Sequence, residues 1–134
     1  MPEAGIPPGL RAALTIADTA LVPFQPRSFD LWTLDKMVSL LTEVSGYREQ
    51  PLRSFAFLNF ADPQGADNAE AAGALRDNPD LTYLDTPIGR RKAFPNAAAA
   101  GLSVFELKPQ DPKASTEIAA LIAAVCIDIE AISE

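Results

Sequence analysis

The sequence predicts an α/β protein with a mainly parallel sheet that is flanked by helices. Two observations support this fold class. Short apolar runs of strand character alternate along the chain with longer runs of helical periodicity. In addition, residues 53–60 (RSFAFLNF) are apolar on both alternating faces, with Phe55 and Phe57 on one face and Ala56 and Leu58 on the other. This pattern is typical of a parallel strand that helices cover on both sides.

The first part of the chain is predicted to form a short helix, a strand and a long helix. Residues 7–18 (PPGLRAALTIAD) place Leu and Ala at helical spacing. Residues 19–24 (TALVPF) form a short apolar run that predicts a buried strand. Ser28 is then expected to be the N-cap of the long helix, and Gly46 is expected to end it. Its apolar stripe should consist of Phe29, Trp32, Met37, Leu40, Leu41 and Val44.

The remaining elements continue the alternation of strands and helices. After the strand at 53–60, Asp67 and Glu70 give a capping-box-like start to a helix. Residues 81–84 (LTYL) predict a third strand, and the alanine-rich run at 90–100 predicts a helix.

Gly101 is expected to be the C-cap of that alanine-rich helix. Asp111 and Pro112 are an N-cap and first-residue pair, and they predict a final helix. Its inward face should consist of Ile118, Leu121, Ile122, Val125 and Ile129. No linker is long enough to divide the chain, so residues 1–134 are expected to form a single α/β domain.

Three short strands provide little sheet area for this many helices. The chain is therefore either a genuine small domain or the second half of a larger doubly wound sheet. The strand at 19–24 is expected to leave an open edge, and open edges invite pairing. We expect a homo-oligomer, or an N-terminal segment that folds over this edge.

Composition excludes several classes of site. The chain has no histidine, so His-dependent nucleophilic triads and His-ligated metals are excluded. Cys126 is the only cysteine, which excludes an internal disulfide, and we expect no metal site. No apolar run approaches the length of a membrane span and no signal peptide is recognisable, so we expect a cytoplasmic protein with no membrane association. With a net charge of −7, any site for an anion must be a local patch.

Three segments together suggest a family: residues 10–41 (LRAALTIADTALVPFQPRSFDLWTLDKMVSLL), residues 57–60 (FLNF) and residues 84–107 (LDTPIGRRKAFPNAAAAGLSVFEL). Their order and spacing resemble the C-terminal part of ParA-type partition ATPases. These deviant-Walker P-loop proteins are related to MinD and segregate plasmids and chromosomes. The resemblance covers the chain from about Leu10 to Ile122. It implies the C-terminal portion of a P-loop NTPase-like doubly wound fold.

The chain departs from the family at the phosphate-binding loop. It contains no Gly-x-x-x-x-Gly-Lys-Ser/Thr motif and no Gly-Lys pair, and the acidic Walker B strand is also missing. Without backbone amides to hold the phosphates and a hydroxyl to bind Mg²⁺, phosphoryl transfer has no machinery. We expect this chain to lack a cofactor, to bind ATP weakly and not to hydrolyse it, although the intact family uses ATP and Mg²⁺.

The resemblance implies a nucleotide-binding set of Asn59, Pro87 and Ile88. In the family, an asparagine at the matching strand end reads the adenine edge, and a carboxamide suits this role because it both donates and accepts hydrogen bonds. Pro87 and Ile88 would flank the base through apolar contact. The alternatives are that Asn59 is a polar strand terminator and that the other two residues form an ordinary strand-to-helix turn.

Arg90, Arg91 and Lys92 form the longest run of cations in the sequence. They occupy the turn that, in the family, carries basic residues contacting DNA without sequence preference. The alternative is a solvated helix start, although cations at a helix N-terminus oppose the macrodipole. We expect the isolated acidic chain to bind DNA poorly. Asp62 and Asp85 also follow strands, but without a metal or a base they do not predict catalysis, and we assign no catalytic residue.

The resemblance therefore implies a partition protein. In an intact relative, ATP drives dimerisation, the dimer binds non-specific DNA, and a centromere-binding partner protein stimulates hydrolysis. Two alternatives remain open. Residues 105–112 (FELKPQDP) resemble the Lys-Pro step that closes the last strand of receiver domains, with Lys108 contacting a phosphorylated aspartate. The phosphoacceptor would be Asp62, but the acidic pair that receivers carry after their first strand is missing. The other alternative is a non-enzymatic interaction domain that binds a protein partner.

Overall fold

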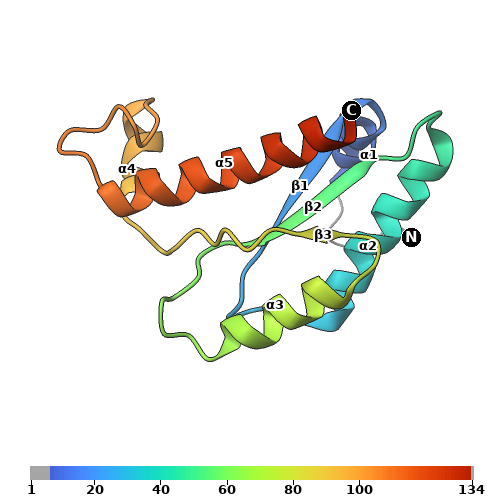
Figure 1. Cartoon of the computed structure of the whole chain (residues 1–134), viewed down its shortest axis with the longest axis horizontal. Coiled ribbons are helices and arrows are strands. Elements are labelled where there is room, and N and C mark those ends of the chain that lie inside the picture. The colour runs from blue at the N-terminus through green and yellow to red at the C-terminus, as the bar shows by residue number, and fades with distance from the viewer. Residues whose placement is uncertain (1–6, 134) are drawn as a thin grey trace.

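The computed structural model describes residues 7–133 of the chain, with side chains as far as residue 127. It confirms an α/β protein in which a three-stranded parallel sheet lies between helices (Figure 1). The elements, in chain order, are α1 (Pro8–Ile16), β1 (Thr19–Phe24), α2 (Leu31–Tyr47), β2 (Arg53–Leu58), α3 (Asp67–Asp77), β3 (Thr82–Tyr83), α4 (Ala93–Ala100) and α5 (Pro112–Ser133).

The sheet has the order β1-β2-β3, and a helix crosses over between each pair of neighbouring strands. α2 connects β1 to β2, and α3 connects β2 to β3, as parallel pairing requires. β1 and β2 pair along their whole length. β3 consists of Thr82 and Tyr83, shorter than the predicted 81–84, and β2 ends at Leu58 rather than at Phe60.

Apolar side chains cover both faces of β2, as its uninterrupted apolar sequence predicts. One face packs against α1, α2 and α3, and in this larger cluster Val44 and Leu75 are fully buried. The other face lies under α5, where Leu121 shares a cluster with Phe55 and Phe57. Figure 1 shows this layering, with α5 on one side of the sheet and α2 and α3 on the other.

The long helix α2 begins later than the sequence predicts. Its N-cap is Asp30 and not Ser28, because Asp30 Oδ1 accepts a hydrogen bond from the backbone N–H of Thr33 at 2.7 Å. A carboxylate is a strong acceptor at the positive end of a helix. With this start, Leu34 takes the inward position on the first turn. Trp32 points outward and is 70% exposed, so its predicted place in the core is wrong.

Two predicted helix caps are confirmed. Gly101 follows α4 with φ of 72°, a left-handed conformation that side chains disfavour and glycine adopts readily. Asp111 precedes α5, and its Oδ1 accepts hydrogen bonds from the backbone N–H groups of Lys113 and Ala114. These two residues fix where the chain leaves α4 and where it enters α5.

Other helix details differ from prediction. Asp67 is the first residue of α3 and not its N-cap, so the expected capping box does not form. α4 begins at Ala93, after the three cations rather than with them. On α5, Ile122 is 51% exposed because the inward face of this helix is centred on the neighbouring Leu121. The prediction for Ile129 lies outside the described side chains.

Candidate functional site

The loops that follow β2 and β3 are held together by backbone hydrogen bonds at the carboxyl end of the sheet. The N–H of Ile88 donates to the carbonyl of Leu58 at 2.9 Å, and the N–H of Ala61 donates to the carbonyl of Ile88 at 3.0 Å. Ala61 and Gly89 form an isolated parallel bridge. Asn59 is tied to β1 in the same way, through its N–H to the carbonyl of Phe24 at 2.8 Å. Ligands of open α/β sheets bind at this end of the strands.

The three residues assigned to nucleotide binding lie at this end but differ in exposure. Asn59 is half-buried, and its carboxamide makes no hydrogen bond to another described residue. Pro87 is exposed. Ile88 is buried in the cluster under α5, where its side chain packs with Phe55. The structure therefore brings their backbones together, while their contact with a base stays a prediction.

Phe60 has an unusual backbone conformation directly after Asn59. Its φ is 52°, in the left-handed region that aromatic residues rarely adopt. Such a conformation costs about 1 kcal/mol or more and is held in place by surrounding structure. The Arg90 guanidinium carbon lies 5.2 Å from the centre of the Phe60 ring. The sequence carries no signal for this turn, because Phe60 continues the apolar pattern of the strand before it.

Two arginines converge on the carboxylate of Asp62. Arg27 Nη2 lies 2.9 Å from Asp62 Oδ2, and Arg90 Nε lies 3.9 Å from Asp62 Oδ1. The three residues follow β1, β2 and β3 respectively. The three side chains and the Phe60 ring make up what we call the arginine–carboxylate cluster. Sequence reasoning missed Arg27 entirely and considered Asp62 only as a weak catalytic or phosphoacceptor candidate.

Arg91 does not pair with Asp62 and instead pairs with Glu117 of α5. Arg91 Nε and Nη2 each lie 2.9 Å from an oxygen of Glu117, and the N–H of Gly89 donates to the same carboxylate at 3.1 Å. The hydrogen bonds from Arg91, helped by the one from Gly89, hold the pKa of Glu117 below its ordinary value. The bond to Glu117 likewise raises the pKa of Arg91. Arg91 thus fastens the loop after β3 to α5.

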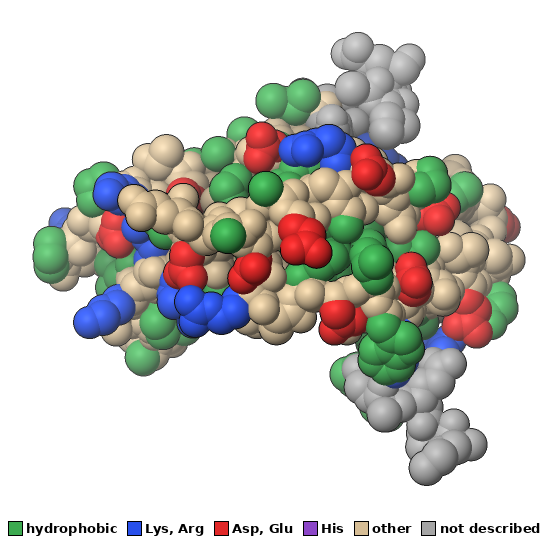
Figure 2. Space-filling model, turned by 90° about the horizontal axis from the view of Figure 1, so that it is seen from below, with side chains coloured by type: hydrophobic (Ala, Val, Ile, Leu, Met, Phe, Trp, Pro, Cys, Tyr) green, Lys and Arg blue, Asp and Glu red, His purple; other side chains and the backbone are tan. Residues whose placement is uncertain are grey.

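The three consecutive cations therefore have three different environments. Arg90 joins the arginine–carboxylate cluster, Arg91 is bound to Glu117, and Lys92 is exposed with no ion-pair partner among residues 7–127. Figure 2 shows that Lys and Arg side chains on this face of the molecule gather mainly towards the left, the end at which the strands finish in Figure 1. Acidic side chains are spread over the whole face and also lie among these basic ones.

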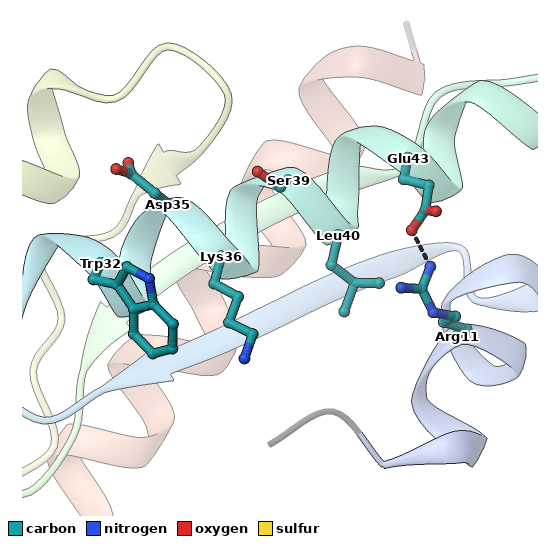
Figure 3. A pocket seen from close by; sticks show the side chains of 7 residues that line it. All are labelled: Arg11, Trp32, Asp35, Lys36, Ser39, Leu40 and Glu43. Atoms are coloured by element: carbon teal, nitrogen blue, oxygen red, sulfur yellow. Dashed lines mark hydrogen bonds and ion pairs between the residues drawn. The ribbon is translucent and has the colours of Figure 1, made fainter. Parts of the chain in front are cut away.

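A separate surface hollow of about 500 Å³ lies between α1 and α2 (Figure 3). An ion pair between Arg11 and Glu43 closes one end. At the other end, Lys36 Nζ lies 4.7 Å from the centre of the exposed Trp32 ring. Arg11, Glu43 and Lys36 are engaged with each other or with a ring, and the Asp35 carboxylate is directed away from them (Figure 3). The charged groups do not converge on an empty centre, and we assign this hollow no ligand.

The features expected of a receiver domain are not found in the described part of the chain. Lys108 is exposed and follows a series of turns, not a strand. Asp62, its expected phosphoacceptor, is already engaged by two arginines. Residues 105–111 form turns and loop, and Pro112 is already the first residue of α5, so the receiver-like step at Lys108 does not close a strand.

Three parallel strands with helices on both faces, and polar groups gathered where the strands end, define an open-sheet α/β protein. The chain is 28% identical over 117 residues to "Maintenance of carboxysome distribution protein A" of Halothiobacillus neapolitanus. The aligned region covers 84% of this chain and 53% of the relative, so the chain spans about half the length of that protein. No family model and no solved structure matches the chain significantly. Within residues 7–133, no helix is both long and apolar enough to span a membrane.

Proposed function

We propose that this chain is the carboxyl-terminal portion of a ParA-like partition or positioning protein. The observation that carries the proposal is its similarity, along 84% of its length, to a protein named for the maintenance of carboxysome distribution. The parallel sheet and the order of the segments that resemble ParA-type ATPases support it. Because the chain spans about half of that relative, the activity of the whole protein forms part of the proposal.

For the nucleotide, we propose that Asn59 and Pro87 face the base, with Ile88 supporting Pro87 from the core. Asn59 is partly accessible and its carboxamide can both donate and accept. The burial of Ile88 fixes the backbone that presents its neighbour. ATP and Mg²⁺ would be bound fully only by an intact protein that includes a phosphate-binding loop, so this chain on its own is expected to be inactive as an ATPase.

For DNA, we propose that Arg90 and Lys92 contact phosphates, whereas Arg91 positions their loop. Both proposed contacts are exposed. Contacts of this kind depend on charge and carry no sequence information. In the intact protein, we propose that a second copy and a centromere-binding partner complete the assembly.

The test compares DNA affinity over a range of salt concentrations for the wild-type chain and for the double variant Arg90→Ala/Lys92→Ala. Binding of the isolated chain is expected to be weak, so fluorescence anisotropy at low ionic strength is suitable. The double variant should bind every sequence more weakly, and its log–log salt slope should fall by about two units, one for each lost phosphate contact.

The matched control removes two cations elsewhere, Lys36 on α2 and Arg76 on α3, by substitution to Ala. It makes the same change in net charge but leaves the loop after β3 intact, so its salt slope should stay close to that of the wild type. If Arg90→Ala/Lys92→Ala leaves both the affinity and the slope unchanged, the DNA contact is wrong.

A further inference from the structure

The arginine–carboxylate cluster places more positive than negative charge at one point. Arg27 and Arg90 approach different oxygens of a single carboxylate, that of Asp62. One contact is short, at 2.9 Å, and the other is long, at 3.9 Å. Asp62 therefore forms a close ion pair with Arg27 but only a long ion pair with Arg90. Two guanidinium groups around one carboxylate leave a net positive charge in a chain whose overall charge is −7.

We propose that Arg27 and Arg90 form a phosphate-binding pair and that Asp62 is its built-in competitor. In this arrangement the Asp62 carboxylate occupies the place that a phosphate group takes when a ligand binds. A phosphodiester of DNA offers two non-bridging acceptor oxygens, as a carboxylate does, and a terminal phosphate offers three. Guanidinium groups bind phosphate and carboxylate in the same forked geometry. Where DNA supplies the phosphate, this proposal rests on the proposed DNA contact and names the residues that bind the phosphate.

The cluster is accessible to a ligand. The side chains of Arg27 and Arg90 are 72% and 52% exposed. Beside them lies an open hollow of about 470 Å³, lined by Arg27, Asp62, Pro63, Gln64 and Gly65. Exposed ion pairs are weak because water and salt screen them. A phosphate that approaches the pair can therefore displace Asp62 at little cost.

The cluster is also held in shape without the Asp62 carboxylate. The backbone carbonyl of Asp62 accepts hydrogen bonds from the N–H of Gly65 at 3.0 Å and from the side-chain amide of Asn68 at 2.7 Å. Arg90 rests over the ring of Phe60, whose left-handed backbone turns that ring toward the cluster. Neither restraint uses the carboxylate, so substituting Asp62 should leave the loop folded.

The experiment measures binding of duplex DNA at low ionic strength to Asp62→Asn and to the control Asp35→Asn. Each substitution removes one negative charge, but Asp35 lies on α2, outside the cluster. Asp62→Asn should bind about three- to fivefold more tightly than wild type, the range that an exposed ion pair allows. Asp35→Asn should stay within about twofold, as a general charge effect predicts. Adding Arg27→Ala to Asp62→Asn should cancel the gain.

A second arm uses inorganic pyrophosphate as the probe, which distinguishes a site for free phosphate from one for DNA. If Asp62→Asn gains affinity for pyrophosphate while no variant binds DNA, the phosphate pair stands and the proposed DNA contact fails. If Asp62→Asn and Asp35→Asn behave alike toward both probes, the proposal is overturned. Asp62→Ala serves as a second variant, and circular dichroism checks that each protein is folded.

Discussion

One face of the sheet is covered over β2 and bare over β1. Leu21 of β1 lies opposite Phe55 of β2, and Pro23 lies opposite Phe57, so these four side chains share one face. Phe55 is 3% exposed under α5, whereas Leu21 is 41% exposed and Pro23 is also exposed. Among residues 7–133, no strand pairs with the outer edge of β1. This face of the sheet is therefore covered over β2, where α5 lies, and uncovered over β1, whose outer edge is also unpaired within these residues.

The covered part of this face stabilises the chain, and the bare part is left as exposed surface. Burial of apolar area supplies the stability, and on this face that burial is concentrated under α5. The uncovered part over β1 combines an unpaired backbone edge with apolar side chains, which is the kind of surface that other polypeptide segments cover. Substitutions on the two sides should therefore have very different effects.

The largest effect is expected on the covered side. Leu121 is 3% exposed and packs against Phe55 and Phe57, so Leu121→Ala should lower the free energy of unfolding by about 2–5 kcal/mol through lost burial and a cavity. Its neighbour Ile122 is half exposed, and Ile122→Ala should cost less than about 1 kcal/mol. Urea denaturation measures both values. Equal losses for the two variants would contradict the assignment of α5's inward face.

This pair of residues also shows what the sequence could predict. The uninterrupted apolar run of β2 indicated a strand covered on both faces, because such burial removes the alternation seen in half-exposed strands. Helical periodicity indicated that both Leu121 and Ile122 belong to an apolar helix. Periodicity could not indicate which of the two residues is buried, because burial depends on which elements lie beside the helix. Trp32 was misplaced because the apolar residues at the start of α2 did not show which of them faces the core, and that residue is Leu34.

The candidate site was less predictable than the fold. The resemblance pointed to Asn59 and Arg90, whose positions follow the strand ends that the sequence reveals. Arg27 and Asp62 were not assigned to it, because they are 35 residues apart and meet only when neighbouring loops are assembled. The pairing of Arg91 with Glu117 could not be predicted either, because Glu117 lies on a helix whose rotation about its own axis the sequence does not fix.

A smaller effect is expected where α5 is fastened to the loop after β3. Glu117→Gln removes a charge that receives two hydrogen bonds from Arg91 and one from Gly89, and it should cost about 1–2 kcal/mol at neutral pH. The pKa of Glu117 is lowered in the folded chain. Its contribution to stability is therefore present above the unfolded-state pKa, near 4.3, and is lost as the pH falls through the folded-state pKa.

The measurement is the free energy of unfolding between pH 7 and pH 3 for wild type and Glu117→Gln. The two curves should lie apart at neutral pH and converge at the acid end, because the carboxyl group is then protonated in both states of the wild type. A constant gap over the whole range would show that Glu117 acts through packing and not through its charge.

The smallest effect on stability is expected at the bare side, together with a change in assembly. We propose that a second copy of the chain pairs with the edge of β1. Leu21→Lys should change the free energy of unfolding by less than about 0.5 kcal/mol, yet shift the population toward the monomer, because a charge on an edge strand opposes pairing. The control is Leu102→Lys, which alters a similarly exposed leucine, 40% accessible, after α4. Light scattering over a range of concentrations that finds wild-type chain entirely monomeric would rule the pairing out.

Pro23 limits which part of the bare edge of β1 can donate hydrogen bonds. The carbonyl of Phe24 faces β2, so by alternation the backbone groups of Thr19, Leu21 and Pro23 face outward. Proline has no N–H to offer an added strand. The edge can therefore donate hydrogen bonds only through its amino-terminal part, away from the arginine–carboxylate cluster. A strand that pairs with this part of the edge would leave the arginine–carboxylate cluster accessible. Addition of a strand to the sheet and binding of a ligand at the cluster would then not obstruct each other.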